Sequence, residues 1–153
     1  MGLIHDLGSG PIGLDTPPFI YLIEEHPEYL AVVRPVFAAM AEGILTGVTS
    51  ALTLMEALVL PFRVGNTPLA EQYQAFLTRS RGLQMEPITG FVLRAAAQLR
   101  AAHNIKTPDA IQIATALLAR CPVYLTNDRN LPLIPGIRIL QVKSYLPPLQ
   151  DRI

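Results

Sequence analysis

Four acidic side chains occupy positions from which carboxylates can do chemistry. Asp15 and Asp128 each end a short apolar run, Glu56 lies alone in a long uncharged segment, and Asp109 stands in the first turn of a predicted helix. Carboxylates in such places can bind metal ions, transfer protons or act as nucleophiles. The first question is whether each acid has a purely structural explanation.

Glu56 is the hardest of the four to explain structurally. It is the only charge between Gly43 and Phe62, and its helical neighbours, Leu52, Val59 and Leu60, are apolar. An unpaired buried carboxylate costs several kcal/mol or becomes protonated, so a cation or a strong donor should face it. The structural alternative is an arginine partner, and the chain contains ten arginines.

Each of the other acids has an ordinary structural alternative. Asp15 and Asp128 can be turn residues at strand ends, and Asn127-Asp128 is a common turn dipeptide. Asp109 follows Thr107-Pro108, and a carboxylate in the first turn of a helix is favoured by about 0.3–1 kcal/mol. We expect that position also to favour the ionised form of Asp109, as a metal ligand requires.

The elements that position these acids alternate along the chain. Apolar runs predict five strands, and helical spacing with N-terminal caps predicts the helices between them. Such alternation predicts an α/β fold with a parallel sheet covered by helices on both faces. The predicted strands are 11–14, 44–49, 83–87, 123–126 and 137–142, and the helices 17–26, 28–42, 51–64, 68–79, 90–103 and 108–120, with Thr67 and Thr107 as caps and Asn104 as a left-handed stop. Helix 51–64 is apolar all round except at Glu56 and is expected to be buried.

In a parallel sheet, ligands bind at the carboxyl ends of the strands, where Asp15 and Asp128 should emerge. Four carboxylates at one edge would repel one another unless divalent cations neutralised them. Oxygen ligands alone favour Mg²⁺ or Mn²⁺ over zinc. Hard metals in a chain without another nucleophilic or phosphate-binding motif indicate phosphoryl chemistry.

Composition narrows the class of protein. The chain has 153 residues, 50% hydrophobic and 16% charged, with twelve acids and twelve bases. We expect a short leader at residues 1–10 and a single domain at 11–153. The only cysteine, Cys121, excludes a disulfide framework and a cysteine zinc site. The uncharged stretch 43–55 is shorter than the roughly 20 residues of a membrane span, so we expect a cytoplasmic protein with no membrane association.

The acidic motifs resemble those of a known family. Gly13-Leu14-Asp15-Thr16, Leu52-Thr53-Leu54-Met55-Glu56, Thr107-Pro108-Asp109-Ala110-Ile111 and Leu125-Thr126-Asn127-Asp128-Arg129 look like the successive motifs of PIN domains, and most of all like the VapC-type ribonuclease toxins. The likeness covers about residues 11–145. It implies a three-layer α/β/α fold with a five-stranded parallel sheet and Mg²⁺- or Mn²⁺-dependent cleavage of RNA. It also implies a homodimer silenced by a cognate antitoxin.

Carried over to this chain, the resemblance makes Asp15, Glu56, Asp109 and Asp128 the acidic quartet, with roles in catalysis and metal binding. Thr16 and Thr126 become supporting hydroxyls, with Asn127 at the rim. One position departs from the family pattern: Pro17 stands where the family usually has Ser or Asn, which removes a polar contact near the metal. Independently of the resemblance, Arg129 could contact a substrate phosphate or pair with an acid.

Two other functions remain open at this point. A phosphatase could use Asp15 as a nucleophile, although the second acid of the haloacid-dehalogenase motif is replaced by Pro17. Alternatively, the chain could be an inert binding module on the same scaffold. Apart from the resemblance, a homodimer is suggested by the apolar helices between Phe19 and Met40.

Overall fold

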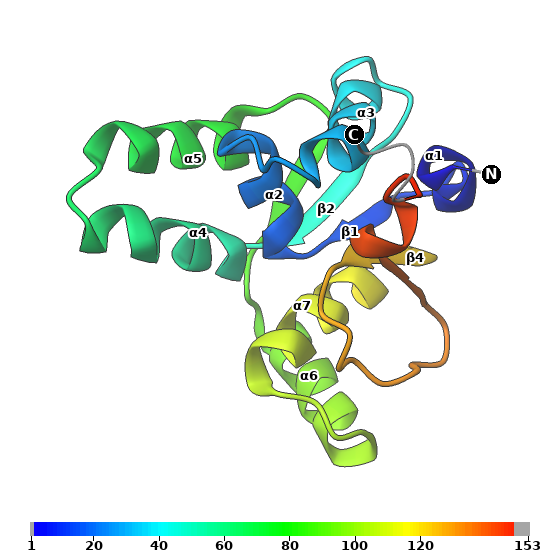
Figure 1. The fold of residues 1–153 in the computed structure, drawn as a ribbon. Coiled ribbons are helices and arrows are strands. Elements are labelled where there is room, and N and C mark those ends of the chain that lie inside the picture. The colour runs from blue at the N-terminus through cyan, green and yellow to red at the C-terminus, as the bar shows by residue number, and fades with distance from the viewer. Residues whose placement is uncertain (1, 149–153) are drawn as a thin grey trace.

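The structure is a computed structural model and describes residues 2–148. Helices and short strands alternate along nearly the whole chain (Figure 1). The strands are β1 (Ile12–Leu14), β2 (Gly47–Ser50), β3 (Leu83–Glu86), β4 (Val123–Thr126) and β5 (Arg138–Gln141). The helices are α1 (Leu3–Leu7), α2 (Thr16–Ile23), α3 (Leu30–Ala41), α4 (Leu52–Arg63), α5 (Thr67–Arg79), α6 (Gly90–Ala102) and α7 (Thr107–Leu118), followed by a 3₁₀ helix at Val142–Tyr145.

The five strands form one parallel sheet in the order β3-β2-β1-β4-β5. Every residue of the three inner strands is buried, because helices cover both faces. The outer strands β3 and β5 are only partly buried. The predicted α/β/α architecture with a five-stranded parallel sheet is therefore confirmed.

Alternate residues of β4 face two separate cores. Val123 and Leu125 belong to the core beneath α1, α2, α3 and α5, whereas Tyr124 belongs to the core beneath α6 and α7. This alternation is the two-residue period of a strand. Figure 1 shows α6 and α7 on one side of the sheet, and α4 and α5 side by side as a pair that extends away from it.

Several boundaries differ from those predicted. The expected leader contains helix α1, whose Leu3 and Leu7 are buried in the first core. Strand β2 begins at Gly47 rather than at residue 44. Asn104 is not the left-handed stop that the sequence predicted, because its φ is not positive and α6 ends in extended backbone at His103.

Two predicted helix caps also shift by one residue. Thr67 and Thr107 are the first residues of α5 and α7 rather than their caps. The side chain of Asn66 caps α5 by accepting from the Leu69 amide at 3.2 Å. At α7 the cap position is Lys106, whose side chain makes no capping hydrogen bond.

Helix α4 is not buried all round, contrary to the prediction. Met55, Val59 and Phe62 are 59%, 43% and 62% exposed, because α4 leaves the sheet together with α5. The apolar side chains suggested as a dimer face, such as Phe19 and Val33, instead fill the first core. No helix within residues 2–148 is both long and apolar enough to cross a membrane.

Candidate functional site

Asp15 lies at the carboxyl end of the central strand β1 and is the N-cap of α2. Its Oδ1 accepts a hydrogen bond from the Thr16 amide at 2.8 Å, and its Oδ2 accepts one from the Thr126 hydroxyl at 2.7 Å. The side chain is only 7% exposed. Because Thr126 ends the neighbouring strand β4, the two predicted motifs meet as the sequence indicated.

Burial dominates the electrostatics of Asp15. Removal from water raises the pKa of this carboxyl, while the hydrogen bonds from Thr126 and Thr16 lower it. The charge of Glu56 raises the pKa of Asp15 further, and a hydrogen bond from the Tyr124 hydroxyl lowers it. Asp15 is therefore a carboxylate that donors hold in a poorly solvated place, which is the setting of a metal ligand.

Glu56 projects from α4 toward the same edge and is half-buried. The Thr16 hydroxyl donates to its Oε1 at 2.6 Å, and the Gln112 amide donates to the same oxygen at 3.3 Å. Glu56 thus has the strong donors that its apolar segment required. They are uncharged side chains of α2 and α7, not an arginine.

Asp109 and Asp128 complete the quartet beside a pocket of about 270 Å³, which Arg100 and Lys106 also line. Burial raises the pKa of Asp109 to about 6, and the charges of Asp15, Asp128 and Glu56 add to the rise. Lys106 opposes this effect. Asp109 therefore lies close enough to the other three predicted acids for their charges to act on it.

The loop after β4 is held by hydrogen bonds around Asp128. The Asp128 amide donates to the Thr126 hydroxyl at 3.1 Å, and its Oδ1 accepts from the Asn130 amide at 2.9 Å. Thr126 thus contacts both Asp15 and Asp128, as a supporting hydroxyl would.

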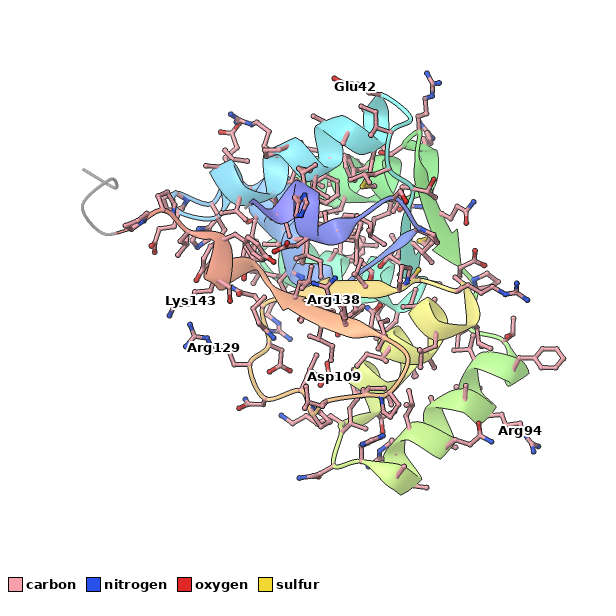
Figure 2. The ribbon with its side chains drawn as sticks, turned by 90° about the vertical axis from the view of Figure 1, so that its right-hand side faces the viewer. Glu42, Arg94, Asp109, Arg129, Arg138 and Lys143 are labelled. Carbon is pink, nitrogen blue, oxygen red and sulfur yellow. The ribbon has the colours of Figure 1, made fainter. Side chains whose placement is uncertain are left out.

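Asn127 and Arg129 have different surroundings. Asn127 donates to the Tyr21 hydroxyl at 3.1 Å and accepts from the Lys143 amide at 3.0 Å, so it ties the loop to two other elements. Arg129 is exposed. In Figure 2, Arg129 and Lys143 extend outward at the left of the view, and Asp109 lies nearer its centre.

Sequence analysis did not single out a buried polar cluster behind the acids. Thr49, Thr53 and Gln112 are almost fully buried and hydrogen-bond to one another or to Thr16 and Glu56. A signal for them was available, because Thr53 lies three residues before Glu56 and Gln112 three residues after Asp109. Residues three apart share one face of a helix, so each polar side chain accompanies its acid.

The donor set fits a hard divalent cation. Four carboxylates gather at one edge, and the pKa of Asp109 is raised by burial and then by the charges of the other three acids, which a bound cation would counter. As the side chains stand, no three His, Cys, Asp or Glu residues within the described part of the chain are close enough to hold one ion. Binding would therefore draw the carboxylates inward. Pro17, in the first turn of α2, adds no polar side chain to the set.

Comparison with solved structures finds the same fold in toxin–antitoxin complexes. One from Klebsiella pneumoniae matches with a TM-score of 0.64 and 21% identity, covering 87% of this chain and 98% of that chain. A DNA-bound VapBC from Salmonella typhimurium matches with a TM-score of 0.61 and 24% identity, covering 87% and 98%. VapBC2 from Rickettsia felis, bound to a promoter fragment, matches with a TM-score of 0.61 and 20% identity, covering 85% and 97%.

Comparison by sequence gives a family. No curated protein matches the chain. The sequence profile of the PIN domain, however, matches residues 12–137 and so includes all four acids and every strand except β5. The chain therefore belongs to the PIN domain family.

Proposed function

We propose that this protein is a Mg²⁺- or Mn²⁺-dependent endoribonuclease that hydrolyses RNA phosphodiester bonds as the toxin of a type II toxin–antitoxin pair. The observation that carries the proposal is the gathering of Asp15, Glu56, Asp109 and Asp128 at the carboxyl edge of the sheet, where burial and the charges of the other three acids raise the pKa of Asp109. Membership of the PIN domain family and the fold shared with toxin–antitoxin complexes support it.

In this proposal Asp15 and Asp109 bind the metal directly, and Glu56 and Asp128 complete the site. Bound Mg²⁺ or Mn²⁺ would supply a hydroxide nucleophile and stabilise the leaving oxygen. The hydrogen bonds from Thr16 and Thr126 keep the Asp15 carboxylate aimed along the edge of the sheet. They thereby supply the orientation that a metal ligand needs.

Positive side chains beside the acids would hold the substrate. Arg100 and Lys106 line the pocket that contains Asp109 and Asp128, and Arg129 lies exposed on the neighbouring loop. These groups could bind the phosphates that flank the cleaved bond, which a neutral protein cannot attract by its net charge. Asn127 contributes less directly, because its amide is engaged with Tyr21.

The phosphatase alternative has less support. Pro17 stands two positions after Asp15, where the haloacid-dehalogenase motif has its second acid, so a nucleophilic Asp15 would lack that acid's support. An inert binding module would keep the same fold, so only measurements of metal binding and cleavage separate it from the nuclease.

Partners are part of the proposal. The solved toxin–antitoxin complexes support an antitoxin as one partner. Apolar side chains left exposed on α4 support a second copy of this chain as another. A cytoplasmic location follows from the RNA substrate and agrees with the buried free thiol of Cys121.

The substitution Asp15→Asn tests the nuclease directly. We expect it to abolish Mn²⁺-stimulated RNA cleavage, because it removes a charge that the metal needs. The protein should stay folded, since an amide of the same shape can still accept from the Thr16 amide and pair with the Thr126 hydroxyl. Cleavage of a labelled RNA and circular dichroism measure the two effects.

Asp6→Asn is the matched control, because it makes the same change outside the site, where Asp6 accepts from the Tyr145 hydroxyl at 2.6 Å. We expect this variant to cleave like the wild type. Cleavage that survives both Asp15→Asn and EDTA would rule out the proposed mechanism.

A further inference from the structure

We propose that Gln112 is a positioning residue of the carboxylate site. Its amide holds Glu56 and Thr16 in place, and it does so at the expense of the fold rather than for its benefit. This inference rests on the proposed function, because it assigns Gln112 to the metal-binding state of the four acids. Gln112 lies on α7, three residues after Asp109, and is 3% exposed.

The direction of the hydrogen bonds is fixed by a backbone carbonyl. The carbonyl of Leu14 can only accept, so the Thr49 hydroxyl donates to it at 2.9 Å. The Thr49 oxygen is then left to accept from Thr53 at 2.8 Å. Having donated its own proton, the Thr53 oxygen accepts from Gln112 Nε2, also at 2.8 Å. The amide nitrogen of Gln112, and not its oxygen, therefore faces the site.

The same nitrogen reaches two groups next to Asp15. Gln112 Nε2 lies 3.3 Å from Glu56 Oε1 and 3.4 Å from Thr16 Oγ1. The Thr16 hydroxyl in turn donates to Glu56 Oε1 at 2.6 Å. Gln112 thus joins α7, which carries Asp109, to α4, which carries Glu56, and to α2, which begins beside Asp15. Two donors on one oxygen restrict how the Glu56 carboxylate can turn.

The other end of the Gln112 side chain is a burden on the fold. Its Oε1 is buried and has no hydrogen-bond partner within the described part of the chain. A methionine would occupy a similar volume without burying that oxygen. The substitution would remove the amide donors of Gln112 but would leave no hydroxyl proton unpaired. Thr53 would still donate to Thr49, and Thr16 would still donate to Glu56. Stability alone therefore favours an apolar residue here.

The substitution Gln112→Met separates the two roles. We expect the metal-free variant to unfold in urea at the wild-type midpoint or above it. We expect its dissociation constant for Mn²⁺, measured by calorimetry, to rise by about 10- to 100-fold, as is usual when a residue that orients metal ligands is lost. RNA cleavage should fall through kcat more than through KM, because Gln112 contacts no exposed surface from which substrate could be bound.

Gln98→Met is the matched control, because Gln98 is exposed on α6, the helix packed against α7. It should change neither the Mn²⁺ affinity nor the urea midpoint. A Gln112→Met protein that is unfolded, or has a lower midpoint, would make Gln112 a residue of the fold and overturn the proposal. Wild-type Mn²⁺ affinity in Gln112→Met would also overturn it while leaving the nuclease standing. A wild type that binds no Mn²⁺ would instead defeat the proposed function, and this inference with it.

Discussion

Asp15 and Asp109 both lose hydration in the folded protein, but the charges of the two carboxylates are compensated differently. Asp15 is almost completely buried, but hydrogen bonds from Thr16 and Thr126 compensate part of its lost hydration. Asp109 is more exposed and lies among three other acids, with Lys106 as the opposing charge. The electrostatic strain of the metal-free site therefore lies at Asp109, where it comes first from burial and then from repulsion by the other acids.

This strain predicts that Asp109→Asn stabilises the metal-free protein at neutral pH. The pKa of Asp109 is about 6 in the folded protein and 3.8 in the reference state, so folding favours the protonated acid. Its contribution to stability is present below pH 3.8 and is lost as the pH rises through about 6. If Asp109 were fully buried, this difference in pKa would change the free energy of unfolding by about 3 kcal/mol. Because Asp109 is half-exposed, solvent screening leaves about 1 kcal/mol.

Urea unfolding in EDTA measures this difference. Asp109→Asn should exceed the wild type in stability at pH 7.5, and the gap should close as the pH falls toward 4. A gap that is the same at every pH would mean that the substitution acts through packing and not through charge.

Sequence reasoning at this scale named the acids and two of their supports, Thr16 and Thr126, but not Gln112 and Thr53. An acid in an apolar segment is conspicuous, because a buried carboxylate requires a partner. Gln112 and Thr53 carry no charge, and an uncharged polar side chain on a helix does not by itself indicate a functional site. Their role depends on the packing of α7 against α4, which no local pattern contains.

At the scale of elements, the strands could be predicted because their apolar runs lie between turns and are buried on both faces. The exposure of α4 could not be predicted in the same way. Its composition is that of a buried helix, but it leaves the sheet with α5 and leaves Met55, Val59 and Phe62 in solvent. A hydrophobic pattern shows that one face of a helix should be buried, but it does not show which element or partner buries it.

The close contact of β1 with α7 gives a prediction about Gly13. A Cβ at Gly13 would lie 2.7 Å from the Cβ of Ala116 and 2.9 Å from Tyr124 Cδ1. The Cβ of Ala116 is fixed to the backbone of α7, so that helix would have to move, together with Asp109. We expect Gly13→Ala to cost about 1–3 kcal/mol, as overpacking does, and to reduce cleavage even under conditions where the protein is fully folded.

Gly47→Ala provides the comparison. A Cβ there would lie 2.5 Å from Met40 Cε and 2.9 Å from Leu14 Cδ1, the ends of side chains that can turn aside. We expect a smaller loss of stability and near-normal cleavage, measured by urea unfolding and by single-turnover RNA cleavage. Equal losses of cleavage in the two variants would show that the position of α7 does not limit the site.

At the scale of the whole molecule, zero net charge has two consequences. It leaves no broad electrostatic attraction for RNA, so in the proposed function RNA binding would depend on the basic side chains around the acidic edge and on the metal. It also leaves little long-range repulsion between two copies of the chain. Exposed apolar surface can then promote self-association.

The exposed stripe of α4 predicts where two copies meet. Met55, Val59 and Phe62 are spaced four and three residues apart, so they lie along one side of the helix. A helix side of this kind can pack against the same side of a second copy about a two-fold axis. Such a contact would bury these three side chains on both copies. We expect the wild type to be a dimer in light scattering, at twice its mass of 16.7 kDa.

Val59→Glu and Phe62→Glu should each weaken that dimer. Burial of one such side chain contributes about 1.5–3 kcal/mol, and symmetry doubles the loss, so the dissociation constant of the dimer should rise at least about 100-fold. Phe91→Glu is the control, because Phe91 is 81% exposed on α6, on the other side of the sheet. If the wild type is a monomer, or if both α4 variants dimerise like Phe91→Glu, then the stripe does not join two copies. The proposed antitoxin would then be the expected occupant of this stripe, and the same variants should fail to bind it.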